Sequence, residues 1–281
     1  MAIDLHIHST ASDGALSPAA IVRMAHAVGL SAIALSDHDS VTGVPQALDA
    51  GAARGLTVVP ALELSAEHES GLSVHILGYF IDHTDAALLA YLAELRSVRL
   101  VRARQMVEAL RDDGYDIDFD DVLARSDGGA VGRVHVAQAL IAAGRVRSVR
   151  EAFETLIGDG GPYFVRKPVP APADVVTTIR AAGGVPVLAH PSVNGTAHLA
   201  EELLGAGLEG LEALHAQHSA AERETLSRAA ERLGLIVTGG SDFHGEDATA
   251  TRLGDGAVPD EVLDALIARA RDRGRRHAQA T

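Results

Sequence analysis

The chain has 281 residues, of which 47% are hydrophobic, with no cysteine and a formal net charge of −14. This length and apolar content fit one large domain, or a domain with an insertion, around a sizeable core. The lack of cysteine excludes disulfides and thiolate-ligated metals, the acidic balance argues against a broad grip on long nucleic acid, and no apolar run is long enough to span a bilayer.

Short apolar runs alternate with amphipathic stretches over most of the chain. In the first part, we predict strands at Ala2–Leu5, Ser31–Leu35, Leu56–Pro60 and Val74–Phe80, and between them helices at Pro18–Val28 and Gly43–Arg54. In the last part, the order repeats, with strands at Val185–Ala189, Leu208–Leu214 and Leu235–Thr238 and helices at Ala197–Leu204 and Ala220–Leu233. The alternation predicts an α/β fold with a parallel sheet, open or closed into a barrel.

The middle of the chain has a different pattern. Residues 85–157 look helical almost throughout, including a long charged stretch at Ala86–Arg111. We interpret them as a helical insertion in an α/β body made of residues 1–84 and 158–281. Gly158–Pro162 would return the chain to that body, and the prolines that follow mark a stiff linker. A last helix is predicted at Val262–Arg275, with a solvated basic end.

Two histidines at the end of the first predicted strand suggest a metal site. His6 and His8 are two residues apart, so their side chains point to the same side of an extended segment. Two polar residues on a solvated strand face would explain this spacing equally well. Asp13 follows in the turn Ser12-Asp13-Gly14, where an ordinary turn residue is the commoner explanation.

Acidic and imidazole side chains recur at later strand ends. Asp37 and His38 follow the second strand, where both are costly to bury without partners. Glu63 follows the third strand between two leucines, in a place that suits neither a surface nor a core carboxylate. A carboxylate that bridges two cations would resolve this conflict.

The remaining candidates lie further along the chain. His75 is embedded in an apolar strand, where a hydrogen-bonded core histidine is the usual explanation. His190 ends a β-rich run, and Asp242 and His244 end the last strand with the spacing of the first pair. Nine such positions hold only His, Asp and Glu, and nine ligands exceed what one ion can use. We therefore expect two or three divalent ions at the carboxyl ends of the strands, where barrel enzymes keep their active sites.

Four motifs resemble, in order, the signatures of the polymerase and histidinol phosphatase (PHP) family: His6-Ile7-His8, Asp37-His38, Ala189-His190-Pro191 and Asp242-Phe243-His244. The resemblance covers nearly the whole chain. It implies a distorted (β/α)7 barrel, an inserted helical subdomain that covers the active site, and a site for three ions of manganese, or else of zinc or iron.

The resemblance also implies how the ligands are shared. The first ion would be held by His6, His8, Glu63 and Asp242. Glu63 would bridge to a second ion, held by His75 and His190. The third ion would be held by Asp13, His38 and His244.

Within the family, the insertion resembles a subgroup that acts on nucleotides. Gly132-Arg133-Val134-His135 is similar to that subgroup's insertion motif, which implies that Arg133 and His135 contact substrate phosphate. His218 resembles a further phosphate-binding position and a candidate proton donor, and Lys167 is a weaker candidate. No such motif surrounds the other histidines, which we expect to be surface or structural residues: His26, His68, His83, His198, His215 and His277.

We therefore expect a hydrolase that removes the 3′-phosphate of nucleoside 3′,5′-bisphosphates or related short nucleotides, by attack of a metal-bridging hydroxide. Alternatives are a 5′-3′ exoribonuclease on short RNA, a histidinol phosphatase, an amidohydrolase and a non-catalytic metal- or nucleotide-binding module. A small phosphorylated nucleotide is the expected partner, with no obligate protein partner and no membrane. The start of the chain shows no signal-peptide pattern, so the expected location is the cytoplasm.

Overall fold

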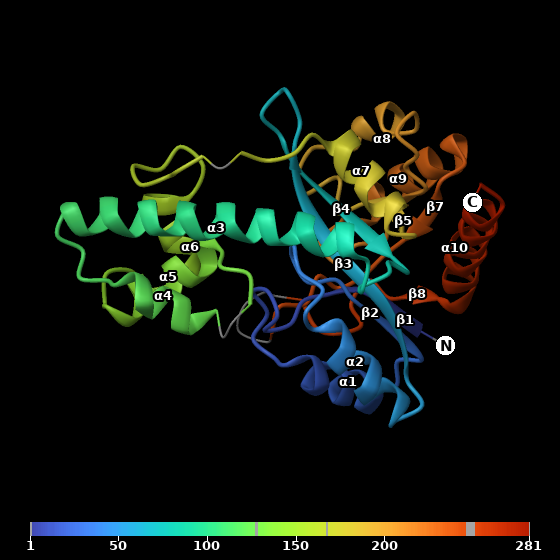
Figure 1. Ribbon diagram of the computed structural model, residues 1–281, viewed down its shortest axis with the longest axis horizontal. Coiled ribbons are helices and arrows are strands. Elements are labelled where there is room, and N and C mark those ends of the chain that lie inside the picture. The colour runs from blue at the N-terminus through green and yellow to red at the C-terminus, as the bar shows by residue number, and fades with distance from the viewer. Residues whose placement is uncertain (1, 127–128, 167, 246–250, 281) are drawn as a thin grey trace.

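The computed structural model describes residues 2–126, 129–166, 168–245 and 251–280, with side chains up to Asp272. Eight strands form a nearly closed barrel-like sheet in the order β7-β6-β5-β4-β3-β2-β1-β8 (Figure 1). Their bounds are β1 Ala2–Ile7, β2 Ala32–Leu35, β3 Thr57–Glu67, β4 Ser73–Tyr79, β5 Val185–Leu188, β6 Gly210–Glu212, β7 Ile236–Thr238 and β8 Val258–Pro259. The expected α/β barrel is confirmed, and β8 adds a short eighth strand antiparallel to β1.

The predicted all-parallel sheet is wrong at one strand. β4 runs antiparallel to both β3 and β5, whereas the other strands from β1 to β7 pair in parallel. The reason is local: a tight turn in which the Leu72 carbonyl accepts from the His68 amide joins β3 to β4, with no crossover helix between them. This reversal brings the start of β4 to the edge of the sheet where its neighbours end.

The third strand is also longer than predicted. β3 continues through Glu67, so Glu63 lies inside the strand, opposite Leu77 of β4, and does not follow the strand as expected. The sequence after Pro60 keeps a buried apolar character that extends the pairing, and the predicted end at that proline was wrong.

The barrel is closed by the segment after β7. The amide of Asp242 donates to the His6 carbonyl at 2.9 Å, and the amide of His8 donates to the Phe243 carbonyl at 3.0 Å. A side chain at Gly240 would place its Cβ only 2.4 Å from the Cβ of His6. Glycine at this position therefore lets the last candidate ligands come beside the first.

Helices surround the barrel, as Figure 1 shows. α1 is capped by Ser17, whose side chain accepts from the Ala20 amide, and begins with Pro18. The body helices are α1 Pro18–Ala27, α2 Val44–Ala52, α7 Pro172–Ala181, α8 Leu199–Glu202, α9 Ala220–Leu233 and α10 Asp260–Ala280. No bounds were predicted for α7. The others begin and end within two residues of their predicted bounds, except that α10 extends five residues beyond its predicted end.

The chain between β4 and α7 forms a helical unit beside the barrel. The long helix α3 (Ala86–Asp112) runs across both, and α4 (Phe119–Arg125), α5 (Arg133–Ala142), α6 (Val149–Ala152) and a π-helical turn (Phe153–Ile157) pack beneath it (Figure 1). This unit has its own apolar cluster, which includes Met106, Leu110, Val136 and Leu140. None of the helices in the described ranges is both long and apolar enough to cross a membrane.

Candidate metal centre and substrate pocket

Glu63 is the hub of a buried cluster at the carboxyl end of the barrel. Its Oε2 atom lies 3.0 Å from His38 Nδ1, 3.3 Å from His8 Nε2 and 3.4 Å from His6 Nε2. Its Oε1 atom lies 3.0 Å from His75 Nδ1 and 2.9 Å from His190 Nε2. Each oxygen of one carboxylate therefore faces its own group of imidazoles, which is the arrangement that a bridging ligand needs.

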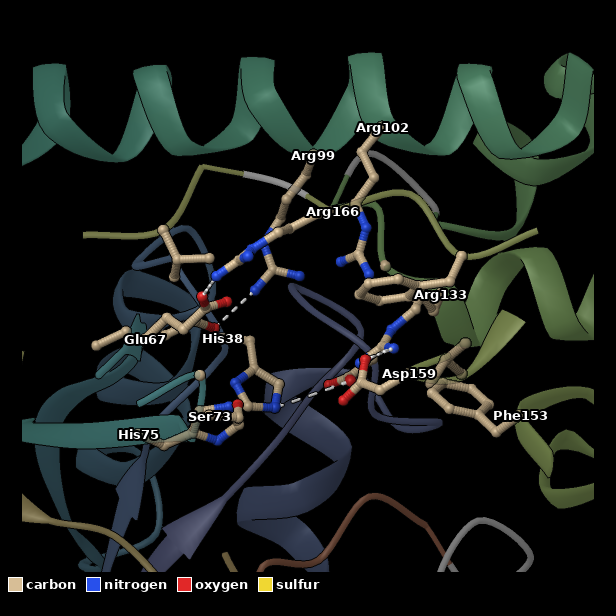
Figure 2. A pocket seen from close by; sticks show the side chains of 18 residues that line it. His38, Glu67, Ser73, His75, Arg99, Arg102, Arg133, Phe153, Asp159 and Arg166 are labelled. Atoms are coloured by element: carbon tan, nitrogen blue, oxygen red, sulfur yellow. Dashed lines mark hydrogen bonds and ion pairs between the residues drawn. The ribbon is translucent and has the colours of Figure 1, made fainter. Parts of the chain in front are cut away.

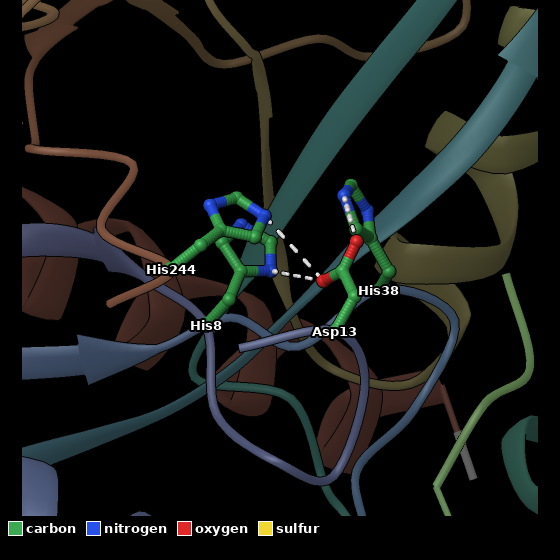
Figure 3. Close-up of side chains that lie close together, drawn as sticks. All are labelled: His8, Asp13, His38 and His244. Atoms are coloured by element: carbon green, nitrogen blue, oxygen red, sulfur yellow. Dashed lines mark ion pairs between the residues drawn. The ribbon is translucent and has the colours of Figure 1, made fainter. Parts of the chain in front are cut away.

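A second group lies at the mouth of the cluster (Figure 3). Asp13 Oδ1 is 3.4 Å from His244 Nε2 and 3.9 Å from His8 Nδ1, and its Oδ2 is 4.0 Å from His38 Nε2. The Nδ1–H of His244 donates to the Asp242 carbonyl at 2.9 Å, so in the neutral ring the lone pair is on Nε2, the atom that faces Asp13. The turn after β1 positions Asp13. In this turn Gly14 lies so close to His8 that a Cβ atom at position 14 would be 2.4 Å from the His8 carbonyl oxygen.

Asp242 completes the cluster on its inner side. Its Oδ1 lies 3.1 Å from His8 Nε2 and 3.4 Å from His6 Nε2. Asp242 and His190 have φ values of 52° and 26°, a region that side chains other than glycine rarely occupy. Backbone strain of this kind persists where a functional geometry is imposed. The structure thus brings all nine candidate ligands together, and their role as ligands stays a prediction.

The cluster has the donor set of a metal centre. Several of its buried polar atoms have no hydrogen-bond partner within the part of the chain that the structure describes: His8 Nδ1, Asp13 Oδ1, His38 Nδ1, Glu63 Oε2 and His190 Nδ1. Nε2 of His6 and Nε2 of His8 lie only 3.1 Å apart. Buried lone pairs that converge without donors are costly, and divalent cations would satisfy them.

A pocket of about 440 Å³ opens from this cluster towards the helical unit (Figure 2). Asp13, His38 and His75 lie on the barrel side. On the opposite side, four arginines point into it: Arg99 and Arg102 from α3, Arg133 from α5, and Arg166 from the linker. The pocket therefore joins candidate metal ligands to a concentration of positive charge, inside a protein whose overall charge is negative.

The four arginines differ in how they are held. Arg99 forms a salt bridge with Asp39, and its Nη2 donates to Ser65 Oγ at 3.1 Å. Arg133 Nη1 is 2.7 Å from Asp159 Oδ1, and Arg166 pairs with Glu67. Arg102 donates through Nε to the Val165 carbonyl at 2.8 Å, and among the residues described no carboxylate forms a salt bridge with it.

The other predicted substrate residues are placed differently. His135 is buried, and its Nδ1 accepts from the Gly132 amide at 2.9 Å, so it caps α5. His218 is buried near His215, and its Nδ1–H donates to the Ala213 carbonyl at 3.0 Å. Neither residue lines the pocket as the described part of the chain defines it. Lys167 lies outside the described residues.

Comparison with known proteins places this site in a family. The PHP domain model matches residues 4–157. The chain belongs to the PHP domain family. It is 36% identical to a 3′,5′-nucleoside bisphosphate phosphatase of Chromobacterium violaceum, over 86% of this chain and 87% of the relative, and 34% identical to a 5′-3′ exoribonuclease of Haemophilus influenzae, over 86% and 89%.

A solved structure agrees with this chain over almost its whole length. A protein of Bifidobacterium adolescentis described as a metal-dependent phosphoesterase superposes with a TM-score of 0.88 at 33% identity, covering 95% of this chain and 96% of the other. This PHP protein is accordingly a metal-dependent phosphoesterase, a hydrolase. The expected family and class of reaction are confirmed.

Charge coupling within the PHP site is strong. Burial opposes protonation of His8, but the carboxylates of Asp242 and Glu63 outweigh it and raise the pKa of His8 to about 10. Burial opposes the charge on Glu63 as well, and His38 and His75 outweigh it and hold its pKa well below the usual range. Protonated His8 thus acts as a counter-cation of Asp242 and Glu63 when no metal is bound.

We expect the thermal stability of the chelator-treated protein to fall as the pH rises from about 6.5 to about 10. His8 titrates near 6.5 when unfolded and near 10 when folded, so its contribution is fully present below 6.5 and is lost as the pH rises through 10. Metal ions bind deprotonated imidazole, so the rise in melting temperature on adding manganese should grow over the same range. Melting curves with and without manganese test this, and a metal-free curve that does not change with pH contradicts it.

Five residues of the site were not among the predicted ones. Glu212 and His215 are fully buried against the metal cluster, and of the two expectations for His215, a surface or a structural residue, the buried position fits the second. Arg99, Arg102 and Arg166 line the pocket. Glu212 had a usable signal, since it lies in a predicted strand between two apolar residues, just as Glu63 is flanked by leucines. Arg99 and Arg102 had none, because arginines on a long charged helix resemble a solvated face.

Proposed function

We propose that this phosphoesterase removes the 3′-phosphate of nucleoside 3′,5′-bisphosphates. The main support is the pocket, in which candidate metal ligands form one wall and four arginines form the other. A substrate with two phosphates can place one at the cluster and the other on the guanidinium groups. Similarity to the bisphosphate phosphatase of C. violaceum supports the same substrate class.

We further propose that two or three divalent ions occupy the cluster, with manganese favoured over zinc or iron. The first would be held by His6, His8, Glu63 and Asp242, the second by Glu63, His75 and His190, and the third by Asp13, His38 and His244. The two-sided contacts of Glu63 support the shared ligand. Such ions lower the pKa of water and neutralise the phosphoryl oxygens during hydrolysis.

The chain's own residues would fix the position of the substrate. Arg102 is the principal candidate for the phosphate that is not cleaved, because its guanidinium lacks a salt-bridge partner among the described residues while burial and the neighbouring Arg133 and Arg99 lower its pKa to about 10. A phosphate would relieve this repulsion. Arg133 would add a second contact, since its pairing with Asp159 uses only part of its five-donor guanidinium.

The proposed roles of the remaining residues follow from their hydrogen bonds. His135, as the cap of α5, would position Arg133, the first residue of that helix. Because a carbonyl only accepts, neutral His218 has its proton on Nδ1 and a lone pair on Nε2, so it would accept a proton or a hydrogen bond before it could donate one. Lys167 stays a proposed phosphate contact.

A substrate screen tests the proposal. With manganese present, we expect phosphate release from a nucleoside 3′,5′-bisphosphate at a kcat/KM at least about tenfold above that for the 3′-monophosphate, which corresponds to one charge-assisted contact of about 1.5 kcal/mol. Release of the 5′-phosphate, or equal rates on both substrates, would contradict it. Histidinol phosphate in the same screen tests the histidinol phosphatase alternative.

A second candidate activity is 5′-3′ exonuclease action on short RNA. The similarity to the exoribonuclease of H. influenzae favours it, and so does the position of Arg166, whose side chain is 72% exposed where the pocket meets solvent. A 5′-phosphorylated dinucleotide distinguishes the two, because only the exonuclease releases a nucleoside 5′-monophosphate from it. Ammonia release tests the amidohydrolase alternative, which lacks support because the only lysine of the sequence is Lys167 and no barrel strand contains one.

A further inference from the structure

Behind the metal cluster, β6 supplies a carboxylate that none of the proposed roles uses. Glu212 is fully buried, and its Oε1 and Oε2 lie 3.0 and 3.2 Å from His6 Nδ1. Its Oε2 also accepts from the backbone amide of His190 at 2.8 Å. Glu212 thus touches two candidate ligand residues, His6 through its ring and His190 through its backbone.

These contacts decide which nitrogen of His6 is free. A carboxylate accepts and cannot donate when ionised, so Nδ1 of His6 must have the proton. In the neutral ring the lone pair then lies on Nε2, the atom that faces Glu63, His8 and Asp242. Nε2 can bind a metal ion only in this tautomer. An outer carboxylate that fixes the tautomer also raises the basicity of the imidazole, so its lone pair binds the metal more strongly.

His215 lies on the same side of the cluster and contacts the carboxylate of Asp242. Its Nδ1 accepts from the Gln217 amide at 3.2 Å, so in the neutral ring the proton is on Nε2. Nε2 is buried and lies 3.6 Å from Asp242 Oδ2, while the other oxygen of Asp242 faces His6 and His8. His215 therefore directs Oδ1 of Asp242 towards the ligand group.

We propose that Glu212 and His215 are positioning residues of the metal centre. Glu212 fixes the tautomer of His6, and His215 fixes the orientation of Asp242. Both come from β6 and the turn that follows it, so one short segment aligns ligands from the first and last motifs of the chain. The inference rests on the proposed metal site and adds two residues that act on metal affinity through others.

Glu212→Gln tests the carboxylate with little change in size. If the amide oxygen of the introduced glutamine takes the place of Oε2 and accepts from the His190 amide, the amide nitrogen faces His6 Nδ1. This nitrogen donates to Nδ1, which forces the proton of His6 onto Nε2. We expect manganese affinity, measured by calorimetry on chelator-treated protein, to fall about 10- to 100-fold. Histidine-selective ¹⁵N spectra of the metal-free protein, recorded at a pH high enough to leave the His6 ring neutral and with the His6 signals assigned by a His6→Asn variant, should show the change of tautomer.

Glu224→Gln is the matched control, since Glu224 is an exposed residue of α9 paired with Arg228. It should leave affinity and tautomer unchanged. Unchanged manganese affinity and His6 tautomer in Glu212→Gln would overturn the role of Glu212. Glu63→Ala separates this result from failure of the proposed site, because a Glu63→Ala protein that still bound manganese normally would overturn the site itself.

His215 is tested by two substitutions that keep different halves of the ring's hydrogen bonding. His215→Gln can place an amide N–H where Nε2 stood, whereas His215→Asn keeps an acceptor near Nδ1 and loses the donor to Asp242. We expect His215→Asn to weaken manganese binding about tenfold and His215→Gln to retain most of it. Equal manganese affinities of the two variants would refute the orienting contact. If Glu212→Gln does not fold, these two variants still test whether the segment of β6 and its following turn positions the metal ligands.

Discussion

Replacing Glu63 by alanine is expected to abolish metal binding and phosphatase activity together. Its two oxygens lie within 3.4 Å of five imidazole nitrogens, so no other carboxylate in the described cluster has as many ligand partners. Loss of an outer carboxylate typically costs roughly 10- to 100-fold in affinity or activity, and loss of a shared ligand should exceed about 100-fold. Bound manganese, measured by mass spectrometry, and phosphate release should fall in parallel.

Two comparisons make this result specific. Asp242→Ala should also lose metal, because Oδ1 of Asp242 lies within 3.5 Å of three histidines. Glu224→Gln, far from the cluster on α9, should keep full metal content. A Glu63→Ala protein that is inactive yet holds its normal complement of manganese would show that Glu63 acts in some other way.

The sequence was most informative where a costly residue type met a predicted strand end. His6, His8, Asp242 and His244 were predicted as ligands because buried imidazole and carboxylate groups need partners, and the alternation of a strand fixes which of them share a side. Local periodicity likewise predicts the helices, since α9 begins and ends where the sequence pattern does. Strand alternation and helix periodicity depend on residues that are close in the sequence, so they can be predicted from the sequence alone.

The errors have a common physical origin in contacts between distant segments. The direction of β4 depends on a short turn that replaces a crossover helix, and the length of β3 depends on pairing with β4 over seven registered positions from Ala61 to Glu67. Neither is visible in the periodicity of a single strand. His75 lies at the cluster because reversal of its strand puts its beginning, opposite Ser65, at the edge where the neighbouring strands end.

The pocket arginines show the same limit on the side of substrate binding. Arg99 and Arg102 are three residues apart on α3, a spacing that is equally common on solvated helices. Only the packing of α3 against the barrel turns them to the pocket, where Asp39 holds Arg99 and Phe164 lies 5.4 Å from the guanidinium of Arg102. Arg133, which also lines the pocket, was predicted through its motif, because the resemblance supplied what spacing could not.

Removal of Arg102 is expected to raise the KM for a nucleoside 3′,5′-bisphosphate with little change in kcat. A hydrogen bond to a charged group contributes about 1.5–3 kcal/mol, so Arg102→Ala should raise this KM about 10- to 150-fold. The guanidinium is charged at neutral pH, because its pKa is lowered only to about 10. KM for a nucleoside 3′-monophosphate should change little, since that substrate has no second phosphate for the arginine to bind.

Arg133→Ala should act in the same direction, and the double variant shows whether the two side chains share one phosphate. If they do, the combined loss should be smaller than the sum of the separate free-energy losses, because each remaining arginine partly compensates. Arg104→Ala is the control on α3, since Arg104 stacks on Phe119, 4.2 Å from the ring centre, and is not part of the pocket lining among the described residues. Equal effects of Arg102→Ala on both substrates, or no effect of Arg133→Ala on the bisphosphate KM, would mean that the second phosphate binds elsewhere.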